Sequence, residues 1–308
     1  MKTVFLKVSI VTLFTAFITF DSHALDESQE VLTSVSGGAG LYNNKGEVLQ
    51  VFKHQGADDI QRMHNGNFLF TSNHSGIFEC DSSGKVVWSF EMKGEKGGGI
   101  MSCKPLKDGT FLASYNSEGQ IVIINREGKF IKTIQLPNIT KGSHGNMRDI
   151  KQLKNGNYLV CQKGLGLNEF DDKGNLVWGI KKPGFTFYVA YETDHNTFIV
   201  TALNCVAEID RDSKKVLWKM TTDELKKVLN CEHIGVMCGL SIMKNGNYMI
   251  SFYKPYDKKT KKGYGMVEIN RDKKVVWKYP EDGKIHPGIT AHSYLSNLII
   301  DKKEVAGK

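Results

Sequence analysis

The sequence predicts an all-β fold, a six-bladed β-propeller of four-stranded blades that is closed by pairing the two chain ends. Three observations predict it: a hairpin motif that recurs along the chain, a second motif that holds every tryptophan, and incomplete repeats at both ends. A chain of 308 residues is long for one ordinary core, but it is normal for a single domain assembled from repeats.

The first motif is a turn followed by an aromatic and an apolar residue. It reads Asn-Gly-Asn-Phe-Leu from position 65 and recurs from positions 155 and 245, with weaker copies from positions 108 and 195. Asn-Gly turns flanked by β-branched and aromatic residues are strong hairpin signals. We therefore expect two antiparallel strands around each copy.

The second motif is a turn followed by two apolar residues and a tryptophan. All four tryptophans of the chain occupy this position: Trp88, Trp178, Trp218 and Trp277. A large ring at one fixed position of each unit can fill the space between adjacent sheets and bury a large apolar area. We therefore predict that the tryptophans are core residues, the alternative being a cofactor-stacking role.

The two motifs together divide each unit into four short strands, with the period of about 40–50 residues that is typical of propeller blades. Residues 41–52 match the second half of a unit, and residues 289–300 match the first half. Five full units and these two halves make six blades. Pairing the ends would close the ring and remove its open sheet edges.

Residues 1–24 are typical of a secretory signal peptide. Lys2 and Lys7 precede an apolar run at 8–20, and Ser22-His23-Ala24 supplies small residues before the expected cleavage point. The run is shorter than the roughly 20 residues that span a bilayer, and no later run reaches that length. We therefore predict a signal peptide at 1–24 and a single β-propeller domain at 25–308, secreted to the periplasm, with no transmembrane segment after signal removal.

Charge and cysteine usage bound the partners. The net charge of +8 favours anionic small molecules or another exported protein, whereas export and the lack of a nucleic-acid motif argue against nucleic acid. Cysteines in an oxidising compartment can form disulfides. Cys231 and Cys238 are the best candidates for a pair, whereas Cys80 takes the place of an apolar residue in other repeats and is expected in the core.

The loops that enter the first strand of each blade should surround the mouth of the central channel, and loops on a rigid scaffold commonly carry function. Histidines recur in these loops, nine residues before Met63, Leu153 and Leu295 and ten before Met243. An aspartate follows two of these histidines at the same distance, and an arginine stands directly before one of the aspartates. The predicted ligand-binding residues are His54, His144, Arg148, His233 and His286, with Asp59 and Asp149 as the recurring acids.

Two interpretations of this set stay open. A ring of imidazoles with one guanidinium suits an anionic ligand, acid–base chemistry or a nucleophilic histidine. Alternatively, each histidine bonds to an aspartate of its own blade and only ties the loop to the sheet. We select His144 and Arg148 as the functional pair, because arginine binds oxyanions through two parallel hydrogen bonds. No metal-ligand spacing is visible, and the sequence identifies no cofactor.

Two further segments should shape the mouth. The basic stretch 254–262, between the second and third strands of blade five, is either a solvated loop or a lid for an acidic ligand. Residues 221–230 are predicted to form a short helix with a capping box from Thr221 to Glu224.

The recurrent elements, an Asp-Ile pair before an Asn-Gly-Asn turn and a Glu-Ile-Asp-Arg-Asp run before Val-Leu-Trp, resemble those of two propeller groups. These are the arylsulfotransferase family and the proteins with pyrroloquinoline-quinone-type repeats. The resemblance implies a periplasmic propeller and, for the first group, sulfate transfer through a channel histidine, for which His144 is the first choice here.

We therefore expect an exported binding propeller with a polar channel mouth. The alternatives are an arylsulfotransferase-like enzyme and a protein-interaction scaffold.

Overall fold

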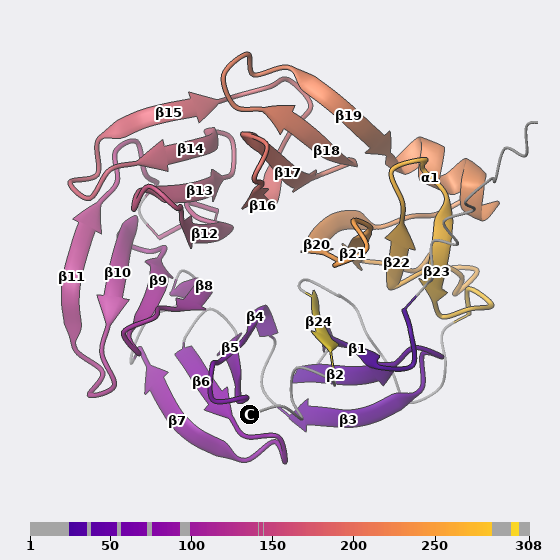
Figure 1. Cartoon of the computed structure of the whole chain (residues 1–308), viewed down its shortest axis with the longest axis horizontal. Helices are drawn as coiled ribbons and strands as arrows, with labels where there is room; N and C mark the ends of the chain where they lie inside the picture. The colour runs from indigo at the N-terminus through magenta and orange to yellow at the C-terminus, as the bar shows by residue number, and fades with distance from the viewer. Residues whose placement is uncertain are drawn as a thin grey trace, which may run out of the picture.

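The computed structural model of the chain describes residues 25–35, 38–53, 57–72, 76–92, 99–140, 142–143, 145–284 and 297–301. Within these residues, 24 strands form six four-stranded antiparallel sheets that stand as blades around a central axis (Figure 1). The predicted six-bladed β-propeller is therefore confirmed. In each blade the first strand lies nearest the axis and the fourth lies at the circumference.

The first three blades follow the predicted strand order. Blade one consists of β4 (Ala57–Arg62), β5 (Phe68–Ser72), β6 (Gly76–Cys80) and β7 (Val86–Glu91). Blade two consists of β8 (Ile100–Pro105), β9 (Phe111–Tyr115), β10 (Gln120–Ile124) and β11 (Phe130–Gln135). Blade three consists of β12 (Asp149–Gln152), β13 (Tyr158–Gln162), β14 (Gly166–Phe170) and β15 (Leu176–Ile180).

Blades four and five are joined by the one helix of the described chain. Blade four consists of β16 (Phe187–Glu192), β17 (Thr197–Ala202), β18 (Cys205–Asp210) and β19 (Val216–Thr221). Helix α1 (Thr222–Leu229) follows, and the predicted capping box between Thr221 and Glu224 is present. Blade five consists of β20 (Val236–Ile242), β21 (Tyr248–Tyr253), β22 (Met266–Ile269) and β23 (Val275–Tyr279).

Blade six joins the two ends of the chain, as predicted, but the division between the ends differs. The C-terminal segment supplies only β24 (Asn297–Asp301), and the N-terminal segment supplies β1 (Gln29–Val35), β2 (Gly38–Asn43) and β3 (Val48–Lys53). We expected two strands from each end. No strand is predicted at residues 29–35 from the sequence. Strand β1 nevertheless lies between β24 and β2, and its residues from Val31 onward are all buried.

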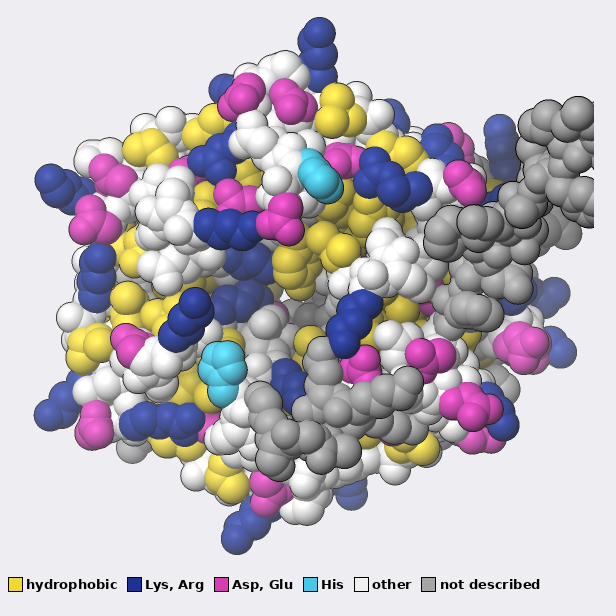
Figure 2. All heavy atoms as spheres, in the orientation of Figure 1, with side chains coloured by type: hydrophobic (Ala, Val, Ile, Leu, Met, Phe, Trp, Pro, Cys, Tyr) yellow, Lys and Arg dark blue, Asp and Glu magenta, His cyan; other side chains and the backbone are white. Residues whose placement is uncertain are grey.

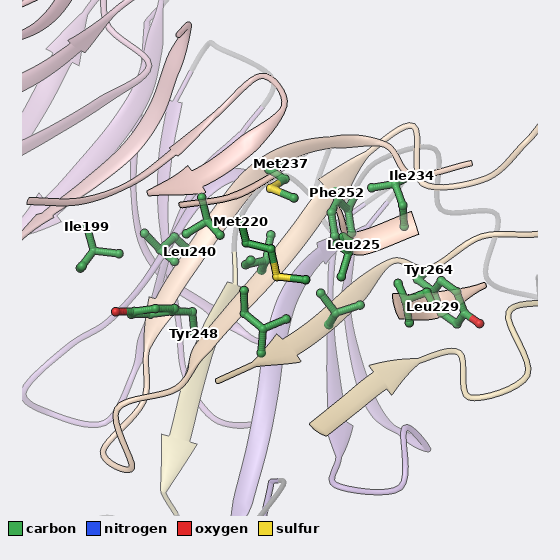
Figure 3. Close-up of a cluster of buried hydrophobic side chains, with 14 residues drawn as sticks. Ile199, Met220, Leu225, Leu229, Ile234, Met237, Leu240, Tyr248, Phe252 and Tyr264 are labelled. Carbon is green, nitrogen blue, oxygen red and sulfur yellow. The ribbon is translucent and has the colours of Figure 1, made fainter. Parts of the chain in front are cut away.

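The apolar core lies between adjacent blades, because the middle strands are buried on both faces. Figure 3 shows the cluster between blades four and five, where Met220, Leu225 and Tyr248 meet. Cys80 has no exposed area and packs beside Phe68 in another cluster, so its predicted place in the core is confirmed.

The four tryptophans lie on outer strands and are half-buried, which corrects their assignment as full core residues. Each ring still fills the junction between two sheets, as with Trp88, whose ring centroid is 4.6 Å from that of Phe111 in the next blade. Each indole Nε1 also donates to a carbonyl of the next blade at 2.6–2.8 Å: that of Arg126, Arg211, Arg271 or Asn44. The polar indole edge explains why these rings stay near the surface.

A buried glutamate faces each tryptophan across the third and fourth strands: Glu79, Glu169, Glu208 and Glu268. In three cases this glutamate pairs with the guanidinium of the arginine whose carbonyl accepts the indole bond: Arg126, Arg211 or Arg271. Asparagines of the Asn-Gly turn often complete the set, as when Asn65 and Asn67 donate to Glu79 at 3.0 and 2.6 Å. We call each such junction a Trp–Glu–Arg seam.

Charge on the surface follows these pairings. On the face of the ring shown in Figure 2, Lys and Arg side chains are interspersed with Asp and Glu side chains around the circumference. The net positive charge is therefore not gathered into one broad patch on this face.

Candidate functional site

The inner strands are irregular where they line the axis. The pairing register between the first two strands shifts within β4, β8, β16 and β20. In blade three, Arg148 directly precedes β12, and its N–H donates 2.7 Å to the Cys161 carbonyl. Such bulges redirect side chains and are frequent beside functional sites. Here each of blades one to five contributes one such residue to a single cavity, in chain order Asp58, Met101, Arg148, Tyr188 and Cys238.

Small hydroxyl side chains of the second strands hold several of these bulges. The Thr71 hydroxyl accepts from the Asp59 N–H at 2.8 Å, and the Ser114 hydroxyl accepts from the Ser102 N–H at 2.9 Å. In blade four, the Thr201 hydroxyl donates 3.0 Å to the Cys238 carbonyl of blade five. Backbone groups that lose a ladder partner thus find a side-chain partner, which keeps the inner strands in a defined shape.

The five redirected residues, together with Asp59, Asp149 and Val189, line a cavity of about 50 Å³ on the axis. This volume holds a few water molecules, or the head group of a ligand whose remainder projects outward. It is far smaller than the roughly 300–1,000 Å³ of a pocket that encloses a whole drug-sized molecule.

A buried ion network lies against this cavity. Lys104 pairs with both Asp59 and Asp149, and Asp149 also pairs with Lys151. The Ser102 hydroxyl donates to Asp59 at 2.8 Å. These residues come from the inner strands of blades one to three, so the network joins three neighbouring blades at the axis. Its two acids and two bases balance.

Mutual pairing keeps the network charged in spite of burial. Burial opposes the ionisation of Asp149, but Lys151 and Lys104 outweigh it and hold the pKa of Asp149 below its usual value. Burial likewise disfavours the ammonium of Lys104, but Asp59 and Asp149 outweigh it and raise the pKa of Lys104 above its usual range. The charges of the network are therefore compensated internally and are not available to a ligand.

Arg148 differs from the charged residues of the ion network. It is half-buried, and its Nε is buried without a hydrogen-bond partner. Its guanidinium lies over the Tyr188 ring at 5.4 Å, and burial raises the pKa of Tyr188, so this ring stays neutral. Asp58, which lines the same cavity, has an interaction of its own. None of the ion pairs among the described residues includes Arg148, although three aspartates line the same cavity.

The predicted site residues do not all gather at one place. Arg148 lines the axial cavity, whereas His233 lines a separate pocket in blade five. His54, His144 and His286 lie outside the described residues. The register of β24 against β1 puts Ile300, rather than Leu295, at the place of Met63, so His286 is farther from that place than the nine residues predicted.

Asp59 and Asp149 bear on the alternative of histidine ties. Their oxygens accept from Lys104, Lys151, Ser102 and backbone amides. The recurring acids therefore belong to the ion network, whereas the histidines of the alternative, His54 and His144, lie outside the described residues.

The second pocket, of about 430 Å³, lies beside α1. His233 lines it, with its Nε2 2.9 Å from the Lys254 carbonyl. The basic stretch 254–262 forms one wall of this pocket and is ordered by Asp257, whose carboxylate accepts from the Thr260 N–H at 2.7 Å. The stretch was expected at the axial mouth, either as a solvated loop or as a lid. Its five lysines are all exposed, as expected of a solvated loop, and the stretch also forms a wall of the blade-five pocket.

Sequence reasoning missed Met101, Tyr188 and Cys238 as cavity residues. A signal was present, because each redirected residue lies five positions before the residue that directly follows the first strand: Met63, Leu106, Leu153, Thr193 or Met243. Counting back nine residues from such positions identifies histidines, whereas counting back five identifies the redirected residues of the cavity.

The expected pair of Cys231 and Cys238 is not formed, and all six cysteines are free. The reason is geometric: Cys231 lines the blade-five pocket, whereas the bulge in β20 directs Cys238 to the axial cavity.

The described chain contains no group of three or more His, Cys, Asp or Glu side chains arranged for a metal ion. In the same residues, no helix has the length and apolar character to cross a membrane.

Comparisons with known proteins extend only to the fold. No family model and no curated protein matches the chain. A protein of unknown function from Bacteroides caccae is similar, with a TM-score of 0.73, 19% identity and coverage of 88% of this chain and 98% of its own. Virginiamycin B lyase from Staphylococcus aureus has a TM-score of 0.53 at 11% identity, covering 80% of this chain and 78% of its own. The Swd1 β-propeller domain of Myceliophthora thermophila has a TM-score of 0.54 at 11% identity, covering 81% and 82%. The comparisons show that the chain has a β-propeller fold.

Proposed function

We propose that the protein is an exported propeller that binds the anionic group of a small ligand, or of an exported partner, at the axial cavity. The observation that carries this proposal is the guanidinium of Arg148, whose buried Nε lacks a hydrogen-bond partner and which none of the ion pairs among the described residues includes. An unsatisfied buried donor costs about 1–3 kcal/mol, and more when it is charged. An oxyanion that accepts from the guanidinium in a bidentate manner would recover this cost.

The surroundings of Arg148 favour an oxyanion attached to an apolar or aromatic body. Tyr188 supports the guanidinium from one side, and Met101 and Cys238 add apolar surface to the cavity wall. Sulfate esters, carboxylates and phosphate esters carry such head groups. We include His54, His144 and His286 as proposed contributors at the mouth, and His233 as a proposed ligand residue of its own pocket.

The test is thermal unfolding with a panel of sulfate, phosphate, benzoate and an aryl sulfate at constant ionic strength. Binding to the folded state raises the melting temperature by mass action. Arg148→Met should abolish the ligand-induced shift without lowering the melting temperature of the free protein. Arg62→Met is the matched control, because Arg62 is also half-buried on an inner strand, with its guanidinium 5.9 Å from the Phe68 ring, but at the other end of that strand.

The outcomes separate clearly. The proposal fails if no anion stabilises the parent, or if Arg62→Met loses the shift as Arg148→Met does. Repeating the screen at pH 6 and pH 8 tests the histidines, since unperturbed imidazole gains its charge below about pH 6.5. A shift that is larger at pH 6 supports their contribution, and an equal shift assigns the anion to Arg148 alone.

An arylsulfotransferase-like activity is the alternative proposal. A solved propeller gives a precedent for histidine-dependent chemistry on this architecture: a histidine-to-alanine variant of S. aureus virginiamycin B lyase is catalytically inactive. In the protein described here, His144 would be the nucleophile and Arg148 would hold the sulfate. Release of the phenol from an aryl sulfate, dependent on both residues, would support the enzyme, and binding without turnover would support the binding protein. A pure interaction scaffold would bind its partner equally well after Arg148→Met.

A further inference from the structure

The junction between blades five and six departs from the other three tryptophan seams. Glu268 faces Trp277, and the indole donates to a carbonyl of the next blade, as elsewhere. That carbonyl belongs to Asn44, however, which stands where the other seams have an arginine. The place of the guanidinium is taken by the backbone nitrogen of Leu25, which donates 3.1 Å to the Glu268 carboxylate.

This carboxylate lacks a cation in the described structure. Glu268 has no exposed area, and none of the ion pairs among the described residues includes it. Burial raises the pKa of Glu268 in spite of hydrogen bonds from Asn247, Asn245 and Leu25. In the matching seam of blade one, burial also opposes ionisation, but Asn65, Asn67 and Arg126 outweigh it and lower the pKa of Glu79. The same motif is therefore charge-balanced in one seam and unbalanced in the other.

Leu25 is held firmly at this place. Leu25 is 3% exposed, and it packs with Val31, Tyr42, Met243 and Met249 in the cluster between blades five and six. The position of its nitrogen beside Glu268 is thus fixed by apolar packing, independently of the hydrogen bond.

Leu25 is also the residue that follows Ser22-His23-Ala24, the predicted signal-peptidase motif. We propose that cleavage at the Ala24–Leu25 bond creates an α-ammonium group that pairs with Glu268 and completes the fourth seam. A signal peptidase would hydrolyse the peptide bond with one water, leaving a carboxylate on Ala24 and an amine on Leu25. That amine is largely protonated at neutral pH, because its unperturbed pKa is about 7.7–8.0. The proposal rests on the proposed export but not on anion binding at the axis.

Removal of the signal peptide must precede the docking of Leu25. Docking buries Leu25, so the peptidase must act on the bond before the residue docks. Only the processed chain then carries the charge that balances Glu268. Removal of the signal is in this way coupled to closure of the ring, since the cluster around Leu25 contains residues of both the closing blade and blade five.

The experiment compares three N-termini on residues 25–308: a free Leu25, an N-acetylated Leu25, and a chain that retains Ser22-His23-Ala24. Each is made with Glu268 and with Glu268→Gln. The free terminus should melt higher than both others by at least about 2 °C, a resolvable effect for a domain of this size. In the Glu268→Gln background the three should melt together. Glu79→Gln is the matched control and should leave the difference between termini unchanged.

The acetylated chain separates charge from chain length, because it keeps the N–H donor and adds almost nothing else. Equal melting of the free and acetylated termini overturns the proposal, as does a difference that persists after Glu268→Gln. The intact mass of protein exported from cells that express all 308 residues tests the cleavage point. A start other than Leu25 overturns the assignment, and absence of export removes the proposed function while leaving the comparison of termini interpretable.

Discussion

The circumference and the axis of the propeller use equivalent positions in opposite ways. At the circumference, the same tryptophan, glutamate and arginine recur in three seams. At the axis, the five equivalent bulge positions carry an acid, a thioether, a guanidinium, a phenol and a thiol. Repeated chemistry meets a repeated need, which is to join one blade to the next. Residues that change from blade to blade cannot serve that need, and this contrast is a reason for placing the proposed site at the axis.

One seam shows how far the repeated chemistry can be altered. Between blades two and three, Ile123 replaces the glutamate, Lys132 replaces the tryptophan and Asp172 replaces the arginine. The Lys132 ammonium lies 3.7 Å from Asp172 and 5.9 Å from the Tyr158 ring centroid. Here the earlier blade supplies the cation and the next blade supplies the acid, which is the reverse of the other seams, and the two blades remain in contact. Exposed pairs of this kind contribute about 0–1 kcal/mol, so this seam should be the weaker one.

We expect the largest effect from removing the closure of the ring, on which both regions depend. Deleting residues 289–308 takes away β24, which pairs with β1 along five residue pairs. Blade six would then expose an unpaired inner strand edge, and we expect aggregation. Size-exclusion chromatography and thermal unfolding provide the measurement. A monodisperse truncated protein with an unchanged melting curve would show that the ring does not depend on this pairing.

The sequence made this architecture predictable because strand turns and tryptophans recur at matching positions, and matching positions require matching structure. The seam glutamates recur as well, but their arginine partners come from the next blade, and spacing along the chain does not reveal a contact between side chains. The axial site was harder for a related reason. Arg148 and Tyr188 share a position but no chemistry, so a search for similar residues passes over them, and only their common distance from the end of the first strand marks the bulge.

The axial network should show the next largest effect. Asp149→Asn removes a buried carboxylate that two lysines share, and breaking a buried pair from one side costs about 3–5 kcal/mol. Because the pKa of Asp149 is lowered in the folded state, its contribution is present above the unfolded value of about 3.9 and is lost as pH falls through the folded value. Urea unfolding between pH 7 and pH 2.5 should therefore show a shallower acid loss in the variant. If both proteins lose the same free energy of unfolding as the pH falls, Asp149 does not contribute to the acid sensitivity.

A comparison of seams should give a smaller effect. Trp178→Ala deletes a half-buried ring and its bond to the Arg211 carbonyl, and we expect a loss of about 3 kcal/mol, the low end for a large aromatic. Lys132→Ala, at the corresponding position of the altered seam, should cost less than about 1 kcal/mol. Urea unfolding measures both. Equal costs would mean that the seams differ in residue type but not in strength.

The smallest effect distinguishes two tyrosines on the same inner strand, β16. Tyr188 lies beneath Arg148 in the cavity, and Tyr191 lies beneath Lys151 of the buried network, with the ammonium 4.1 Å from its ring centroid. A cation over an aromatic face is worth about 0.5–2 kcal/mol, so Tyr188→Leu should weaken anion binding by about 2- to 30-fold. Tyr188→Phe should retain affinity, because the ring face and not the hydroxyl supports the guanidinium. Tyr191→Leu should lower the melting temperature and leave affinity unchanged, since Lys151 is already compensated by Asp149. Calorimetric titration of the three variants against the best anion gives the answer. If Tyr191→Leu weakens binding as much as Tyr188→Leu does, the network and the cavity act as one unit, and the division between supporting and ligand-binding residues at the axis has to be redrawn.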